Sequence, residues 1–262
     1  MSALYHEVRG SGPDLVLLHG WSLNLGVWET LARELAARFR IIAIDLPGHG
    51  RSDWDLKAST PAAQAWRVHE TLAPLTERYA LLGWSLGGQL ALDIAAALPT
   101  AVERLVLVCT TPKFLAAPGW RCGTPRPLLA RLIHRLHVEG ERAVSDFLAL
   151  QVRGGGAPRT AARVLGSLRG ALRTHGAARL DALVSGLARL RDCDLRPALP
   201  QVRVPALVMA GQRDRVIRPG AARALAAALP EGRYVEIAGA AHVPFLSHRV
   251  QFVKHLTGFL CA

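Results

Sequence analysis

Residues 80–97 read ALLGWSLGGQLALDIAAA, and this stretch decides the fold of the chain. The apolar run Ala80–Leu82 is typical of a buried strand, and Gly87–Ala97 has the pattern of a helix. Between them, residues 83–88 (GWSLGG) contain the spacing G-x-S-x-G, which places a serine on a sharp turn between strand and helix. We therefore expect Ser85 to present its hydroxyl to a site at the end of this strand.

Similar apolar runs recur along the chain and predict further strands. They are Leu15–Leu18, Ile41–Ile44, Leu105–Val108, Ala206–Met209 and Tyr234–Ile237, with Ala3–Arg9 compatible with an edge strand. Most lack polar alternation, as strands do when both faces of a parallel sheet are covered. Helical patterns at Val27–Ala37 and Pro61–Glu77 alternate with them. The sequence thus predicts an α/β protein with a mostly parallel, doubly wound sheet.

The strand rhythm stops between Lys113 and about Pro200. This stretch carries helical patterns at Pro127–His137, Glu139–Gln151, Thr160–His175 and Ala178–Leu190. We predict an α/β core formed by residues 1–112 and 197–262, with residues 113–196 as a helical insertion. An excursion above the carboxyl ends of parallel strands would act as a lid over a site there.

Length and composition favour one soluble globular domain. The chain has 262 residues, of which 50% are apolar and 20% charged, so disorder is excluded. His6, Glu7 and Arg9 interrupt the amino-terminal residues, so no signal peptide is expected, and no apolar run approaches the ~20 residues that span a bilayer. The four cysteines lack metal-ligand spacing. We expect a cytoplasmic protein with reduced thiols, no membrane attachment and no metal.

Positive charge is concentrated in the helical insertion. The net charge is +12, and residues 113–196 hold 15 Lys and Arg against 6 Asp and Glu. This distribution indicates an acidic partner or substrate. A compositional bias explains it equally well, because 29 of the basic residues are Arg and the chain is rich in Ala. No nucleic-acid-binding motif accompanies the charge, so no nucleic-acid partner is expected.

A serine nucleophile needs a histidine base and an acid that orients the histidine. In this fold their order is serine, acid, histidine. His242 lies in the loop after the last predicted strand, whereas His248 and His255 lie further on, towards the final helix. Asp214 follows the preceding strand directly. We predict a catalytic triad of Ser85, Asp214 and His242.

Four other acids follow Ser85 in the chain but lie in the helical insertion, where we expect surface ion pairs: Asp146, Asp181, Asp192 and Asp194. The oxyanion formed in acyl transfer needs two backbone donors, predicted here to be the amides of Trp21 and Leu86. His19 precedes the serine and is interpreted as a residue that shapes its loop. The segment Gly48-His49-Gly50 is interpreted as a turn, because Asp53 leaves a GxGxxG pattern incomplete. His134 and His137 have no neighbouring ligand, and no cofactor is expected.

These motifs resemble the α/β-hydrolase superfamily over essentially the whole chain. Narrower matches resemble the pimeloyl-acyl-carrier-protein methyl ester esterases of biotin synthesis. They are His19-Gly20-Trp21 with Leu23-Asn24, residues 147–151 (FLALQ), Asp194-Leu195-Arg196, and residues 240–245 (AAHVPF) with Ser247-His248.

The resemblance implies an α/β-hydrolase fold and a serine carboxylesterase. Such an enzyme cleaves the methyl ester of a pimeloyl chain carried by a small acidic protein, through an acyl-enzyme on Ser85, and releases methanol. The implied substrate-binding residues are Trp21, Ser85, Leu86, Phe147, Leu148, Ala149, Leu150, Gln151 and His242. The implied carrier-docking residues are Arg142, Arg159 and Arg163, while Asp146 stands where the family has a further arginine.

Two alternatives remain open from the sequence. Another serine hydrolase of the superfamily, such as a general carboxylesterase, a lactonase or a carbon-carbon bond hydrolase, would act on a free small molecule with the same triad. A non-catalytic α/β-hydrolase homologue would only bind a ligand, although intact Ser85, Asp214 and His242 favour an enzyme. We expect a monomer whose partner is the acyl carrier protein.

Overall fold

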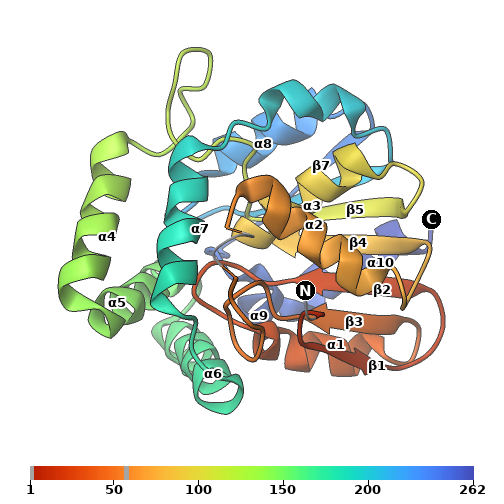
Figure 1. The fold of residues 1–262 in the computed structure, drawn as a ribbon, viewed down its shortest axis with the longest axis horizontal. Helices are drawn as coiled ribbons and strands as arrows, with labels where there is room; N and C mark the ends of the chain where they lie inside the picture. The colour runs from red at the N-terminus through yellow and green to blue at the C-terminus, as the bar shows by residue number, and fades with distance from the viewer. Residues whose placement is uncertain (1–2, 56–58) are drawn as a thin grey trace.

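The computed structural model describes residues 3–55 and 59–262, which form a seven-stranded sheet flanked by helices (Figure 1). The strands are β1 (His6–Arg9), β2 (Asp14–Leu18), β3 (Arg40–Ile44), β4 (Tyr79–Trp84), β5 (Val102–Val108), β6 (Ala206–Gly211) and β7 (Gly232–Ile237). Their order is β1-β3-β2-β4-β5-β6-β7, with β1 antiparallel to β3 and the other pairs parallel. The predicted mostly parallel, doubly wound sheet is confirmed.

Helices cover both faces of the sheet and fill the insertion. The described helices are η1 (Leu25–Trp28), α1 (Glu29–Leu35), α2 (Pro61–Leu72), α3 (Leu86–Ala97), α4 (Arg126–Glu139), α5 (Glu141–Val152), α6 (Pro158–His175), α7 (Leu180–Asp192), η3 (Arg196–Gln201), α8 (Pro219–Ala228), α9 (Pro244–Ser247) and α10 (Arg249–Leu260). Within the described ranges, no helix is both long and apolar enough to cross a membrane.

Two helix predictions needed correction at their ends. The pattern Pro61–Glu77 predicted a longer helix, but α2 stops at Leu72. Pro74 explains the difference, because proline has no N–H to donate to the helix and its ring clashes with the carbonyl of the residue four positions earlier. The helix expected at Val27–Ala37 begins instead as the short 3-10 helix η1, where the Asn24 side chain accepts a hydrogen bond from the Gly26 N–H.

The apolar strands are buried on both faces, as their lack of alternation predicted. Leu15 and Leu17 on β2 share a core with residues of α1 and α10 on one face. Val16 and Leu18 point the other way and share a core with residues of α2, α3 and α8. Each fully buried leucine contributes about 2 kcal/mol. This packing fixes the carboxyl ends of β2, β4, β6 and β7, where the candidate residues emerge.

Helices α4 to α7 lie together at one end of the sheet, on the left of Figure 1, between β5 and β6 in the chain. The two ends of this segment meet where the Leu195 N–H donates to the Pro112 carbonyl at 2.9 Å, and Lys113 forms an ion pair with Asp194 at 3.2 Å. A third apolar cluster joins the segment to the core, and it includes Trp21 and Leu86 from the core. The segment therefore packs directly over the end of β4.

Candidate active site

Ser85 sits on the turn between β4 and α3 in a backbone conformation that side chains rarely adopt. Its φ is 55° and its ψ is −113°. The turn brings strand and helix so close that a Cβ on Gly83 would lie 2.4 Å from the Gly87 carbonyl oxygen, and one on Gly87 would lie 2.4 Å from the His19 oxygen. The glycines of GWSLGG are therefore required by close approach. Backbone strain of this kind costs about 1–3 kcal/mol and is typical of functional sites.

The strain predicts an unusual stability order at position 85. We expect Ser85→Gly to have a free energy of unfolding about 1 kcal/mol above that of Ser85→Ala, because glycine adopts positive φ without a clash. Thermal melts should separate the two variants by about 3 °C. At Ser167, an exposed position on α6, the matched pair should show the reverse order, with alanine above glycine. Equal melting temperatures at position 85 would contradict the strain.

Asp214 and His242 meet in the loops after β6 and β7. Asp214 Oδ2 lies 2.7 Å from His242 Nδ1, and both side chains are buried. The other carboxylate oxygen, Oδ1, accepts the backbone N–H groups of Val216 at 2.8 Å and Ile217 at 3.0 Å. Because the carboxylate accepts the proton on Nδ1, neutral His242 keeps Nε2 as an acceptor. This is the arrangement that a general base requires.

The histidine loop is anchored to the elbow and to the insertion. The His242 carbonyl oxygen accepts a hydrogen bond from the Trp84 Nε1–H at 2.9 Å, and the centroids of the two rings lie 5.5 Å apart. The His242 N–H donates to the carbonyl of Gln151 on α5 at 3.1 Å. Trp84 directly precedes Ser85, so one aromatic residue links the loop of the candidate base to the turn of the candidate nucleophile.

The Ser85 hydroxyl makes no hydrogen bond to any residue in the described ranges. Its backbone is held firmly, because the Ser85 N–H donates to Val108 at 2.9 Å and its carbonyl accepts the Thr110 hydroxyl at 2.6 Å. Catalytic hydrogen bonds often tighten only when substrate binds. A fixed backbone with an unengaged, half-buried hydroxyl suits a nucleophile.

The predicted oxyanion donors have no acceptor among residues 3–55 and 59–262. Neither the Trp21 N–H nor the Leu86 N–H donates to a described residue. Leu86 is the first residue of α3, where free N–H groups and the helix dipole favour negative charge. Trp21 is held by its indole N–H, which donates to the Leu183 carbonyl on α7 at 2.9 Å. Its ring packs edge to face against Phe147, with the two ring centroids 5.0 Å apart.

His19 shapes its loop, as predicted. Its Nδ1–H donates to the Gly20 carbonyl at 2.8 Å, and its Nε2 accepts the Leu46 N–H at 2.9 Å. Burial lowers the pKa of His19 well below its ordinary value, so the ring stays neutral. Burial also lowers the pKa of the neighbouring His49 to about 4. With both ring nitrogens engaged, His19 has no free atom for catalysis.

Cys109 is a close neighbour of the acid-base pair that sequence reasoning missed. Its Sγ and single ligand atoms of Asp214 and His242 lie within 4.8 Å of one another, and its φ is +45°. Burial, together with the Asp214 charge, raises the pKa of the thiol, so it remains neutral. The only available signal was its position directly after β5. His134 and His137 join no such cluster among the described residues.

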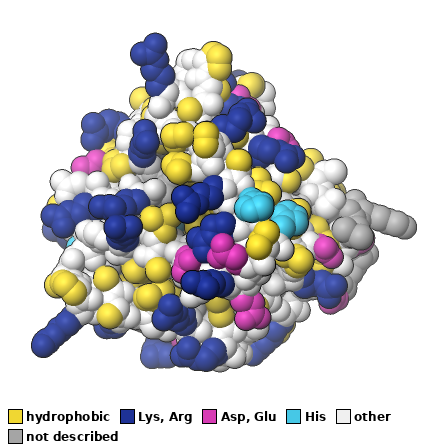
Figure 2. Space-filling view, turned by 90° about the vertical axis from the view of Figure 1, so that its left-hand side faces the viewer, with side chains coloured by type: hydrophobic (Ala, Val, Ile, Leu, Met, Phe, Trp, Pro, Cys, Tyr) yellow, Lys and Arg dark blue, Asp and Glu magenta, His cyan; other side chains and the backbone are white. Residues whose placement is uncertain are grey.

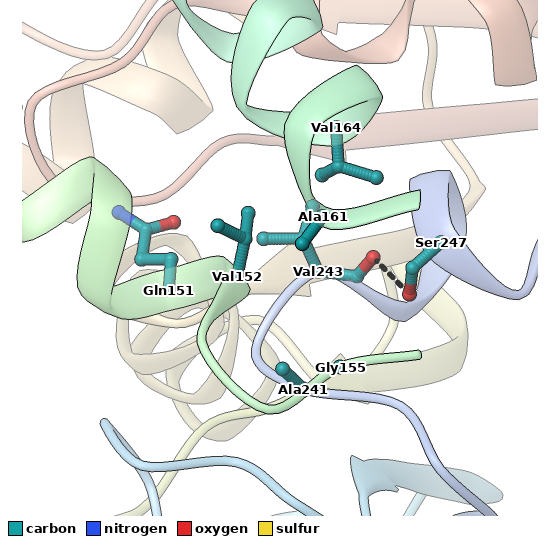
Figure 3. A pocket seen from close by; sticks show the side chains of 8 residues that line it. All are labelled: Gln151, Val152, Gly155, Ala161, Val164, Ala241, Val243 and Ser247. Atoms are coloured by element: carbon teal, nitrogen blue, oxygen red, sulfur yellow. Dashed lines mark hydrogen bonds between the residues drawn. The ribbon is translucent and has the colours of Figure 1, made fainter. Parts of the chain in front are cut away.

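The residues of the FLALQ segment lie on different sides of α5. Phe147 contacts Trp21, Leu148 is in the main core cluster, and Leu150 is 36% exposed. Ala149 is half-buried. Gln151 is buried, and its Oε1 has no partner within the described ranges. Gln151 lines a cavity of about 10 Å³ beside the histidine loop (Figure 3), which has the size of about one water and is too small for a substrate.

The arginines predicted to dock a carrier lie on α5 and α6. Arg142, Arg159 and Arg163 are exposed, and none forms an ion pair with a described residue. Arg163 donates to the Leu246 carbonyl at 3.1 Å. By contrast, three of the four aspartates in the insertion form the expected ion pairs: Asp146 with Arg135, Asp192 with Arg191, and Asp194 with Arg196 and Lys113. Most of the acids in the insertion are therefore paired, while these three arginines form no ion pair with a described residue.

Comparison with known proteins agrees with this geometry. Residues 15–255 match the model of the alpha/beta hydrolase family. The chain belongs to this family. The α/β-hydrolase fold predicted by resemblance is thereby confirmed, and the solved structures that this α/β hydrolase resembles agree. The esterase EaEST of Exiguobacterium antarcticum has a TM-score of 0.89 at 25% identity, covering 99% of this chain and 96% of that one.

Curated relatives of this α/β hydrolase carry one recurrent name. Two proteins named pimeloyl-(acyl-carrier protein) methyl ester esterase are 39% and 40% identical to it, from Xanthomonas oryzae pv. oryzae (strain MAFF 311018) and Edwardsiella ictaluri (strain 93-146). The match covers 99% of this chain in both cases, and 99% and 98% of the relatives. The resemblance drawn from the sequence motifs is confirmed at full length.

Proposed function

We propose that this α/β hydrolase is a serine carboxylesterase that hydrolyses the methyl ester of pimeloyl-acyl-carrier protein, a step of biotin synthesis. The observation that carries the chemistry is the buried 2.7 Å contact between Asp214 and His242, held by Trp84 next to the Ser85 turn. The names of the relatives support the substrate. A methanol-release assay on carrier-bound pimeloyl methyl ester tests the proposal directly.

The reaction follows from the roles of these groups. Ser85 Oγ attacks the ester carbonyl carbon while His242 Nε2 takes the hydroxyl proton. The resulting oxyanion is bound by the N–H groups of Trp21 and Leu86. As the bond to the methoxy oxygen breaks, His242 returns the proton and methanol leaves, with the acyl group on Ser85. Water, deprotonated by His242, then releases the acid and restores the serine.

The surface of the helical insertion supports an acidic carrier. Lys and Arg side chains outnumber acidic ones on the face that Figure 2 shows. Much of the acidic charge in residues 113–196 is consumed by ion pairs, which leaves Arg142, Arg159 and Arg163 available. In this proposal the insertion acts as a lid that positions the acyl chain, and these arginines meet the carrier.

Neutralising the three arginines should weaken the encounter with the carrier. In Arg142→Gln/Arg159→Gln/Arg163→Gln, we expect kcat/KM for carrier-bound substrate to fall about tenfold and its salt dependence to flatten, because exposed charges steer association. Hydrolysis of a small soluble ester should change little, since Ser85 and His242 stay in place. Initial rates on both substrates, measured from low to high salt, check this result.

Two controls separate docking from structure. Arg131→Gln, on the exposed side of α4, removes one positive charge elsewhere on the insertion and should leave both substrates unaffected, whereas each single Arg→Gln variant at positions 142 and 159 should lower kcat/KM for the carrier-bound substrate. Arg142→Gln/Arg159→Gln spares Arg163, whose hydrogen bond to Leu246 has a structural role. An equal loss on both substrates would assign the arginines to lid structure. If kcat/KM fell for neither substrate, the positive charge of the insertion would reflect compositional bias.

A lactonase or a general esterase remains the competing activity. The enol-lactonase of Burkholderia xenovorans LB400 has the same fold, with a TM-score of 0.84 at 25% identity. Comparing carrier-bound pimeloyl methyl ester with free methyl esters and lactones decides between these substrates. Labelling of Ser85 by a fluorophosphonate separates any of these enzymes from a binding protein.

Location and assembly stay predictions. A biosynthetic substrate attached to a carrier supports the cytoplasm. Size-exclusion chromatography with light scattering tests the expected monomer, and the absence of nucleic-acid binding is tested by mobility shift at physiological salt.

A further inference from the structure

A groove of about 640 Å³ runs between the helices of the insertion, separate from the cavity beside His242. Residues of α4, α5, α6 and α7 form its walls, and most of its lining is apolar, including Leu136, Leu148 and Leu183. Leu180 at its edge is 53% exposed. Volume and lining match those of a small-molecule site.

The floor of the groove carries a buried polar atom without a partner. Ser22 lines the groove and is 1% exposed, and its Oγ has no hydrogen-bond partner in the described part of the chain. Its φ of 67° holds it in a strained conformation. An unsatisfied buried hydroxyl costs about 1–3 kcal/mol, so a ligand that supplies a partner would gain binding energy there.

Two arginines of α6 line the same groove. Arg169 reaches across it and donates to the Ser145 hydroxyl on α5 at 3.3 Å. Arg173, one turn further on, makes no ion pair with a described residue. Glu141 is the acidic residue in the lining, so the charges of the groove sum to a positive value. An apolar groove with this charge suits a chain that ends in an anion.

The groove shares a wall with the candidate active site. Ser22 and Leu148 line the groove, and they directly follow Trp21 and Phe147 in the chain. The ring centroids of Trp21 and Phe147 lie 5.0 Å apart. Leu183, also in the lining, accepts the Trp21 indole N–H. Trp21 carries a predicted oxyanion donor. The Trp21–Phe147 pair therefore adjoins the lining of the groove and also carries that predicted oxyanion donor.

We propose that this groove binds the part of the substrate remote from the ester, with the acyl chain along its apolar walls and a distal anion at Arg169 and Arg173. This inference rests on the proposed function. The anion is a free carboxylate, as in a dicarboxylic acid monomethyl ester, or the phosphate of a carrier arm. In either case, the chain passes the Trp21–Phe147 pair, so these two rings move apart when it binds.

Binding to Ser85→Ala by calorimetry tests the groove without turnover. The probes are monomethyl pimelate and methyl 7-hydroxyheptanoate, which differ in the distal charge, and the methyl pimeloyl thioesters of phosphopantetheine and of pantetheine, which differ in the phosphate. In at least one pair, we expect the anionic probe to bind about fivefold more tightly, and Arg169→Gln/Arg173→Gln to abolish that advantage. Whichever pair responds identifies the anion.

Matched variants sharpen the result. Glu141→Gln should tighten binding of the anionic probe about twofold by removing a like charge, and Arg131→Gln should change nothing. No advantage for either anion, or an advantage that survives the double variant, would overturn the groove assignment. Fluorophosphonate labelling of the wild type is an independent test of the proposed function. If Ser85 did not react, the proposed function would be rejected, and the calorimetry would still show whether the groove binds the anionic probes.

Discussion

Ser85→Ala should lose ester hydrolysis almost completely, with kcat falling by about 10⁴-fold or more, because no other group can form the acyl-enzyme. His242→Ala should lose nearly as much, since the hydroxyl attacks only when Nε2 takes its proton. The two losses should not add in the double variant, because nucleophile and base act as one unit. Methanol release and fluorophosphonate labelling measure both effects.

Matched variants show whether the loss is local. His255→Ala, on α10, removes a half-buried histidine away from the site and should leave turnover unchanged. Ser85→Ala should retain a cooperative thermal transition, because the hydroxyl makes no hydrogen bond to a described residue. Turnover near the wild-type level in folded Ser85→Ala would reject the elbow assignment.

Sequence patterns predicted the sheet because its strands are buried on both faces. Ile41–Ile44 and Leu105–Val108 are continuous apolar runs, and both lie in strands of the parallel part of the sheet. The same logic placed Asp214 and His242 near each other, since carboxyl ends of parallel strands meet at one edge. Their 2.7 Å contact bears this out.

Other features lay beyond sequence reasoning because they depend on how distant segments pack. Cys109 approaches Asp214 only because β5 and β6 are neighbours with a particular register. The groove gathers Ser22 with residues of four helices, and side-chain directions across helices cannot be read from spacing. Exposure of Leu150 within FLALQ likewise follows from the way α5 lies against the core.

Asp214→Asn should cost about 10⁴-fold in kcat while leaving the fold intact, because it imposes the wrong tautomer on His242. The backbone N–H groups of Val216 and Ile217 both point at Oδ1, so the amide must place its oxygen there. Its NH₂ group then faces Nδ1 and donates to it, which moves the histidine proton to Nε2 and removes the acceptor for the serine proton. Nitrogen NMR of the imidazole should show this exchange, and kcat on a methyl ester reports its cost. Asp181→Asn, on the exposed side of α7, is the matched control and should match the wild type. Wild-type turnover in Asp214→Asn would mean that another acid orients His242.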